Sequence, residues 1–236
     1  MPTKDQLRNN TWQLMTDRNV GAFPFPLEGR IPNFKGSNDA ARLLQTLDIW
    51  KRAKTVKANP DAPQLKAREL ALKDGKHLFM AVPRLRDEHP FREITPPANI
   101  KPRKAVSISG SQKYGKPRGV EELPHIDLII AGSVAVHSDG RRVGKGGGYS
   151  DLEFALAREA GKITENTVIV STVHSLQLSE ENLPFEDHDI PLDYIITPDE
   201  VIETNTTYAR PKGIIPGILS DEYLDDIPAL EKFLNE

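Results

Sequence analysis

Short apolar runs with almost no polar interruption constrain the fold of this chain more than any other feature. The clearest are Leu128-Ile-Ile130 and Val168-Ile-Val170. Such strands are buried on both faces, which is typical of a parallel sheet whose strands are joined by helices. Between these two runs, residues 150–160 have helical character and end at Gly161. The alternation predicts an α/β fold with a mostly parallel sheet and helices on both faces.

The remaining elements follow from periodicity and from capping signals. Thr3 and Gln6 form a capping-box pattern at the start of the first helix. Prolines interrupt residues 21–35 and 84–103, which we expect to be loops. We expect strands over residues 55–58, 77–82, 104–109, 126–131, 168–173 and 194–197. We expect helices over residues 4–16, 37–50, 61–73, 150–160 and 223–234.

Size and composition limit the class of protein. The 236 residues can bury a sizeable core and contain no obvious linker, so we expect one domain over residues 1–236. No apolar run approaches the roughly 20 residues that span a bilayer, and the N-terminus lacks the apolar core of a secretory signal. The lack of cysteine excludes thiolate chemistry. The net charge of −3 argues against general electrostatic binding of nucleic acid. We therefore expect a cytoplasmic protein without membrane or nucleic-acid partners.

The segment with the most chemical information is Gly140-Arg-Arg-Val-Gly-Lys-Gly-Gly-Gly-Tyr-Ser-Asp151, between a buried strand and a helix. Four of the five residues from 144 to 148 are glycine, so backbone N–H groups can approach a ligand closely. Arg141, Arg142 and Lys145 add cationic donors, and the helix N-terminus adds its dipole. This combination predicts a polyphosphate site, in which Asp151 could hold Mg²⁺.

The alternative for this segment is a flexible glycine hairpin whose basic residues are only solvated. We favour the phosphate site because cations alternate with glycines between a strand and a helix. The spacing excludes a P-loop, since no Gly-Lys-Ser/Thr opens the helix, and the final glycine of the dinucleotide fingerprint is missing. Other signals are weaker. The histidines show no zinc-site spacing, Glu153 is expected on the helix surface, and Phe23, Phe25 and Phe34 either wall a flat ligand or anchor their loop.

The glycine segment and the preceding Asp127-Leu-Ile-Ile130 resemble the signature of the 5-formyltetrahydrofolate cyclo-ligase family, also called methenyltetrahydrofolate synthetases. In that family a strand leads into a G-x-R-L-G-x-G-x-G-Y-Y-D loop that holds ATP. Lys4 and Arg8 match the family's N-terminal K-x-x-x-R pair, and Asp189 matches its late aspartate on Mg²⁺. The resemblance implies a three-layer, Rossmann-like domain of the ribose-phosphate-isomerase and CoA-transferase type.

The chain is also similar to a subgroup, the methenyltetrahydrofolate synthetase domain-containing proteins. The shared segments are Arg30-Ile-Pro-Asn-Phe-Lys-Gly36, Val56-Lys-Ala-Asn-Pro-Asp-Ala-Pro63, Gly144-Lys-Gly-Gly-Gly-Tyr-Ser-Asp-Leu-Glu153 and Asp193-Tyr-Ile-Ile-Thr-Pro198. The resemblance implies Arg142 and Lys145 as catalytic residues and Asp151 and Asp189 as Mg²⁺ ligands. It implies an ATP site made of Lys4, Arg8, Arg142, Val143, Gly144, Lys145, Gly146, Gly147, Gly148, Tyr149 and Ser150.

The activity implied by the resemblance is ATP- and Mg²⁺-dependent conversion of 5-formyltetrahydrofolate to 5,10-methenyltetrahydrofolate, with release of ADP and phosphate. The chain departs from the family pattern at Ser150, where the family has a second tyrosine, and at Leu152, where arginine is frequent. Two alternatives remain open. One is a divergent paralogue that binds ATP and a related heterocycle without cyclo-ligase activity and serves thiamin metabolism. The other, an interaction or RNA-associated module, is disfavoured by the acidic balance.

Overall fold

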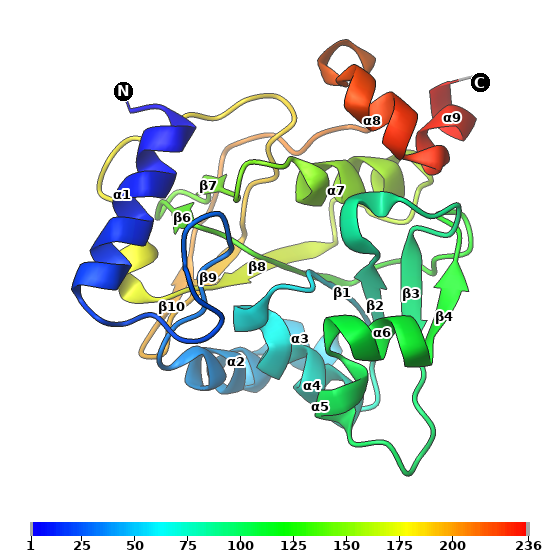
Figure 1. The fold of residues 1–236 in the computed structure, drawn as a ribbon, viewed down its shortest axis with the longest axis horizontal. Coiled ribbons are helices and arrows are strands. Elements are labelled where there is room, and N and C mark those ends of the chain that lie inside the picture. The colour runs from blue at the N-terminus through cyan, green and yellow to red at the C-terminus, as the bar shows by residue number, and fades with distance from the viewer. Residues whose placement is uncertain (1, 235–236) are drawn as a thin grey trace.

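Two hydrophobic cores lie on opposite faces of one eight-stranded sheet in the computed structural model, which describes residues 2–234 (Figure 1). The strand order is β10-β9-β8-β5-β1-β2-β3-β4, and β9, β8, β5, β1 and β2 run parallel. The edge strands β4 and β10, and β3 next to β4, pair antiparallel with their neighbours. The strands are β1 (Thr55–Ala58), β2 (His77–Ala81), β3 (Phe91–Ile94), β4 (Gly115–Arg118), β5 (Leu128–Ala131), β8 (Val168–Thr172), β9 (Tyr194–Ile196) and β10 (Val201–Glu203).

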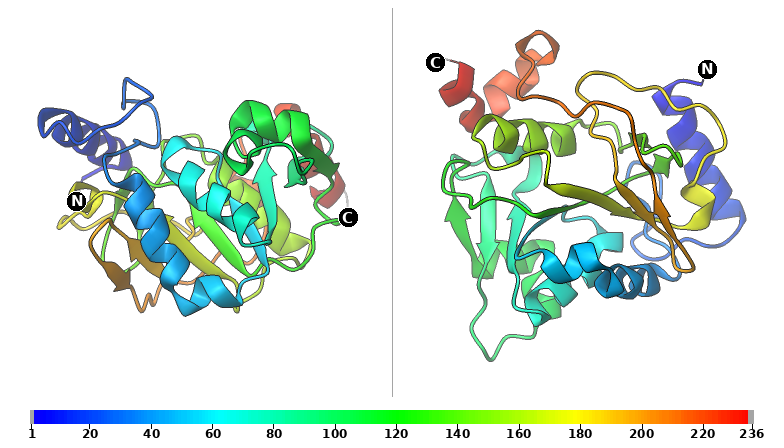
Figure 2. Two further views of the ribbon diagram at one scale, coloured as in Figure 1. Left: turned by 90° about the horizontal axis from the view of Figure 1, so that it is seen from below. Right: turned by 180° about the vertical axis from the view of Figure 1, so that it is seen from behind.

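Alternation along the strands creates the two cores, because successive side chains point to opposite faces of a sheet. In β5, Leu128 and Ile130 belong to one core and Ile129 to the other. Helices cover both faces, so the molecule has three layers (Figure 2). One side carries α1 (Lys4–Asp17), α2 (Ser37–Thr46), α3 (Asp48–Arg52), α4 (Leu65–Lys73), α5 (Pro102–Ala105) and α6 (Ile108–Tyr114), and the other carries α7 (Tyr149–Glu159), α8 (Asp221–Asp226) and α9 (Pro228–Leu234).

Short elements complete the connections. A two-stranded hairpin of β6 (Ala135–Val136) and β7 (Arg142–Val143) leads into the glycine segment and α7. The 3₁₀ turns are η1 (Ala62–Gln64), η2 (Pro83–Leu85), η3 (Ser175–Gln177) and η4 (Pro216–Ile218). None of the helices within residues 2–234 is both long and apolar enough to cross a membrane.

The structure contains most of the predicted helices and strands, with some corrections. The capping box of α1 is confirmed, since the Thr3 hydroxyl accepts from the Gln6 amide. The strand predicted over residues 104–109 is wrong: Pro102 opens α5, and the Ser107 hydroxyl caps α6 by accepting from the Gly110 amide at 3.0 Å. The helix predicted over 37–50 is divided at Leu47, and the one over 223–234 at Ile227. Strand β3 lies inside the predicted loop 84–103, and β4, β6, β7 and β10 were not expected.

The parallel strands β1, β2, β5 and β8 all end at the same edge of the sheet. Ligand sites in open α/β sheets form at this carboxyl edge. Asn59 follows β1 there, Gly132 follows β5, and the glycine segment reaches the same edge before α7 begins. The fold therefore places the predicted phosphate loop beside the ends of the central strands.

Candidate active site

The backbone of the glycine segment has positive φ angles and close contacts that strain a residue with a side chain. Gly146 and Gly148 have positive φ angles of 107° and 59°. A Cβ added at Gly148 would lie 2.8 Å from the Tyr223 hydroxyl. Gly148 is also the N-cap of α7 and supplies no side-chain oxygen, so it leaves N–H groups of the first turn available to a ligand. This backbone can present N–H groups to an anion, and the predicted phosphate site itself stays a prediction.

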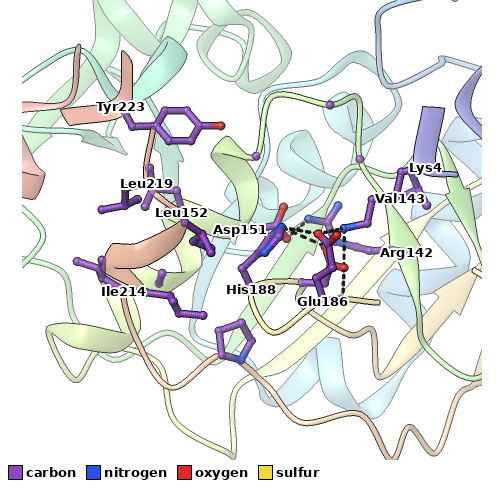
Figure 3. A pocket seen from close by; sticks show the side chains of 18 of the residues that line it. Lys4, Arg142, Val143, Asp151, Leu152, Glu186, His188, Ile214, Leu219 and Tyr223 are labelled. Atoms are coloured by element: carbon purple, nitrogen blue, oxygen red, sulfur yellow. Dashed lines mark hydrogen bonds and ion pairs between the residues drawn. The ribbon is translucent and has the colours of Figure 1, made fainter. Parts of the chain in front are cut away.

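A cavity of about 310 Å³, here called the first cleft, lies on one side of this loop (Figure 3). Its charged end brings together α1, the loop and the segment near Asp189, while its other end is apolar. Among the predicted site residues it is lined by Lys4, Arg8, Arg142, Val143, Gly144, Gly146, Gly148, Asp151 and Asp189.

Lys4 is held among acidic groups in the first cleft. Its Nζ donates to Asp189 Oδ2 at 2.7 Å and to Glu186 Oε2 at 2.9 Å. This hydrogen bond lowers the pKa of Glu186. Ligand atoms of Glu186, His188 and Asp189 lie within 4.8 Å of one another. Carboxylate oxygens suit Mg²⁺. Sequence reasoning found Asp189 but missed its two neighbours, although all three stand within four consecutive residues.

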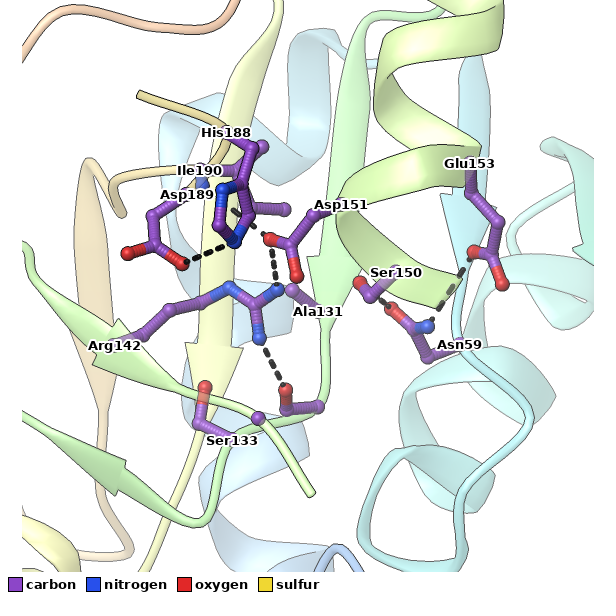
Figure 4. Close-up of polar contacts among 12 residues, drawn as sticks. Asn59, Ala131, Ser133, Arg142, Ser150, Asp151, Glu153, His188, Asp189 and Ile190 are labelled. Carbon is purple, nitrogen blue, oxygen red and sulfur yellow. Dashed lines mark hydrogen bonds and ion pairs between the residues drawn. The ribbon is translucent and has the colours of Figure 1, made fainter. Parts of the chain in front are cut away.

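Arg142 ties the loop to the sheet and to α7 (Figure 4). Its buried guanidinium donates from Nη1 to the Gly132 carbonyl at 2.9 Å and from Nη2 to Asp151 Oδ1 at 2.7 Å. Within residues 2–234, Arg142 Nε is buried and finds no hydrogen-bond acceptor. Asp151, predicted as a metal ligand, forms an ion pair with Arg142 and accepts from the Ile190 amide at 3.4 Å, beside the segment that carries Glu186, His188 and Asp189.

A larger cavity of about 490 Å³, the second cleft, lies on the other side of the loop. Four predicted residues face only this cleft: Lys145, Gly147, Tyr149 and Ser150. Arg142, Gly144, Gly148 and Asp151 line both cavities. The structure therefore divides the predicted ATP site, with Lys145 on the side of the second cleft, where its Nζ lies 3.1 Å from Asp61 Oδ1.

A chain of polar side chains runs along the second cleft from the loop to β1. The Ser150 hydroxyl donates to Asn59 Oδ1 at 3.4 Å, and Asn59 Nδ2 donates to Glu153 Oε2 at 3.5 Å. The same Glu153 oxygen forms an ion pair with Lys57, and the two side chains are 5% and 3% exposed. Burial raises the pKa of Glu153, and the Lys57 charge opposes this effect. The prediction that Glu153 lies on the helix surface is wrong, because that face of α7 packs toward β1.

The aromatic residues of the 21–35 loop divide between core and surface. Phe34 is buried and packs edge-on against the His174 ring. Phe23 and Phe25 are 81% and 60% exposed, and neither lines the two clefts. The prediction that these two rings wall a ligand therefore finds no support in this arrangement. Burial lowers the pKa of His174.

Comparisons with known proteins show the family to which the chain is similar. The model of the 5-formyltetrahydrofolate cyclo-ligase family matches residues 1–198. The methenyltetrahydrofolate synthase domain-containing protein of Bos taurus is 39% identical over 238 residues, covering 99% of this chain and 62% of the relative. Its Homo sapiens counterpart is 39% identical over 233 residues, covering 97% and 60%. The chain thus spans about three fifths of the length of these relatives.

Two more distant comparisons concern the cyclo-ligases themselves. The 5-formyltetrahydrofolate cyclo-ligase of Escherichia coli (strain K12) is 36% identical over 86 residues, which cover 36% of this chain and 44% of that protein. The NMR structure of Aquifex aeolicus 5,10-methenyltetrahydrofolate synthetase superposes with a TM-score of 0.56 at 20% identity, covering 87% of this chain and 95% of that one. This likeness confirms the predicted α/β fold class.

Proposed function

The chain belongs to the 5-formyltetrahydrofolate cyclo-ligase family, and on this premise we propose that it uses ATP to cyclise 5-formyltetrahydrofolate to 5,10-methenyltetrahydrofolate. One observation carries the proposal: the two clefts meet at the glycine loop, where Arg142, Gly144, Gly148 and Asp151 line both. A nucleotide in the first cleft and a reduced folate in the second would bring their reacting groups together at these shared residues.

The reaction needs no protein nucleophile. The formyl oxygen attacks the γ-phosphate of ATP and ADP leaves. N10 then attacks the activated formyl carbon and gives up its proton, and phosphate leaves. Catalysis of this kind depends on positioning and on stabilisation of charge. Arg142, with its buried donors at the junction, would stabilise negative charge on the transferring group. Lys145 would approach the same group from the second cleft, and Lys4 and Arg8 would hold phosphate oxygens in the first.

The donor set of the first cleft fits a magnesium ion. Asp189, Glu186 and Asp151 offer the hard carboxylate oxygens that Mg²⁺ prefers. When bound, Mg²⁺ neutralises phosphate charge and orients the phosphate chain. A Cβ at Gly144 or Gly146 would be in ordinary van der Waals contact, at 3.5 Å, with the guanidinium of Arg142 or Arg8, so space does not require glycine there. Gly146 is favoured by its positive φ angle.

A second candidate function is favoured by the polar chain Ser150, Asn59, Glu153 and Lys57. This chain of hydrogen bonds begins at Ser150, where the family pattern has tyrosine, and ends in a buried ion pair. The polar groups of the second cleft can therefore hydrogen-bond to a ligand that carries several donors. A tyrosine at position 150 would displace these groups. We propose as the alternative a paralogue with the same nucleotide site and a different heterocyclic substrate, such as one of thiamin metabolism.

The deciding experiment measures ADP release by the purified chain with Mg²⁺-ATP, in the presence and absence of 5-formyltetrahydrofolate. Release that depends on the folate, together with formation of the methenyl product, supports cyclo-ligase activity. ATP binding without this turnover supports the alternative substrate. Failure to bind ATP would contradict both proposals. Arg142→Gln serves as the inactive control, and Lys51→Met, on exposed α3, as the control for a distant change in charge.

A further inference from the structure

The apolar end of the first cleft is built by residues beyond the part of the chain that the family model matches. That match ends at residue 198. Figure 3 shows Ile214, Leu219 and Tyr223 on one side of the cavity, beside Leu152 of α7, and Lys4 and Arg142 on the other. The lining residues from the later segment are Pro211, Gly213, Ile214, Ile215, Ile218, Leu219 and Tyr223.

Several contacts hold this segment against the glycine loop. The Tyr223 hydroxyl donates to the Gly147 carbonyl at 2.7 Å, and its ring packs edge-on against Tyr149 with centroids 5.5 Å apart. The Ile214 amide donates to Glu159 Oε2 of α7 at 3.0 Å. Asp226 forms an ion pair with Arg86. These contacts fix the segment to the glycine loop through Tyr223 and to α7 through Ile214, and the helix that follows is held to Arg86.

The side chains of the wall are only partly enclosed by the protein. Ile214 and Leu219 pack against one of the two cores but, like Ile215, are only partly buried, and Ile218 is 50% exposed. Large aliphatic side chains that remain open around a cavity mark a ligand surface more often than a structural one. The ligand that matches a cavity with one cationic end and one aliphatic end carries a phosphate chain joined to a flat, weakly polar ring.

We propose that residues 211–223 form the base-binding wall of the nucleotide site, with Ile214, Ile218 and Leu219 packing against the heteroaromatic base. Tyr223 is a positioning residue that fixes this wall to Gly147. The inference rests on the proposed function, because it requires that a nucleoside triphosphate occupies the first cleft. It adds that selection of the base depends on a segment outside the family match.

The experiment compares ATP with inorganic tripolyphosphate, which has the phosphate chain but no base, by calorimetry on the full chain with Mg²⁺. We expect the unmodified protein to bind ATP more tightly. Ile218→Ser should weaken ATP binding roughly fivefold and leave tripolyphosphate binding unchanged. Tyr223→Ala should weaken ATP binding roughly tenfold or more. Ile218 is half exposed, so its replacement should not prevent folding.

The matched control is Tyr208→Ala. Tyr208 is also partly buried, also lies beyond residue 198 and packs on Phe185, but it lines neither cleft. Equal affinity of the unmodified protein for ATP and tripolyphosphate would overturn the base-binding wall and leave the phosphate site standing. An equal loss of affinity for ATP and for tripolyphosphate in Ile218→Ser would also overturn it, since the segment would then only support the loop. Binding of neither ligand by the unmodified protein would overturn the proposed function and this inference together.

Discussion

The two clefts share one glycine loop but are lined by different kinds of groups. In the first cleft, backbone N–H groups, a helix N-terminus and fixed cations face the cavity, and these belong to the motif that identifies the family. In the second, side chains of β1, of α7 and of Asn59 are linked by hydrogen bonds and an ion pair. Phosphate binding by backbone tolerates sequence change, whereas a side-chain network is altered by a single substitution. If the proposed function holds, members with this loop should therefore differ in substrate mainly through the second cleft.

The largest effect is expected from Lys57→Met, which leaves Glu153 buried without its ionic partner. Removal of one partner of a buried ion pair typically costs about 3–5 kcal/mol of unfolding free energy, whereas replacement of both partners is often neutral. We expect urea denaturation to show this loss in Lys57→Met and its recovery in Lys57→Met/Glu153→Leu. A loss below about 1 kcal/mol in the single variant would mean that the pair is hydrated and that the polar chain is not a unit.

The same variant should show a distinctive pH dependence. Burial already raises the pKa of Glu153, and loss of Lys57 removes the effect that opposes it. The folded state then keeps the proton at pH values where the unfolded chain releases it, so stability is complete below the ordinary carboxyl pKa of about 4.3 and falls as pH rises through the folded-state pKa. The deficit of Lys57→Met relative to the unmodified protein should be larger at pH 8 than at pH 5. An equal deficit at both values would contradict this account.

Lys4→Met tests the first cleft alone, because Lys4 lines only that cavity. Loss of one charge-assisted hydrogen bond to phosphate should cost about 1.5–3 kcal/mol, or roughly a tenfold to hundredfold loss of ATP affinity by calorimetry. Binding in the second cleft should not change. The control Lys51→Met removes an exposed charge on α3. An equal loss of affinity for ATP and for the ligand of the second cleft would contradict the distinction between the clefts.

Asp151→Asn tests the junction of the two clefts, because Asp151 lines both. An amide oxygen is a weaker ligand for Mg²⁺ than a carboxylate, and the change also weakens the ion pair with Arg142. We expect roughly a tenfold increase in the Mg²⁺ concentration needed for half-maximal ATP use, a change of about 1.4 kcal/mol. Asp187→Asn, on the exposed residue next to His188, is the matched control. Unchanged metal dependence would limit Asp151 to holding Arg142 and to placing a negative charge in the first turn of α7.

The sequence reveals the first cleft far better than the second. Four glycines, their flanking cations and the strand before them are local in sequence, so the phosphate loop and the central strands could be predicted. The Lys57–Glu153 pair could not be located by spacing, because 96 residues separate its members. One signal was available: a lysine in the middle of a short apolar strand implies a buried partner. The helices α5 and α6 were missed because their caps, not their apolar pattern, determine them.

Ser150→Tyr is the smallest expected change and the most direct test of how the clefts differ. The Ser150 side chain faces only the second cleft, where its hydroxyl donates to Asn59. A tyrosine would restore the family pattern, fill part of the cavity and disconnect Asn59 from the loop. ATP affinity should stay within about twofold, a difference near 0.4 kcal/mol, because the first cleft is untouched. Affinity for 5-formyltetrahydrofolate should rise by up to about tenfold if a stacking face is regained. Calorimetry with each ligand measures both effects, and Ser150→Ala separates the lost hydrogen bond from the added ring.

Rapid, saturable cyclisation by the unmodified protein would show that serine serves this substrate as well as tyrosine does. The polar chain would then be a structural brace between β1 and α7, and the second cleft would carry no divergence at this position.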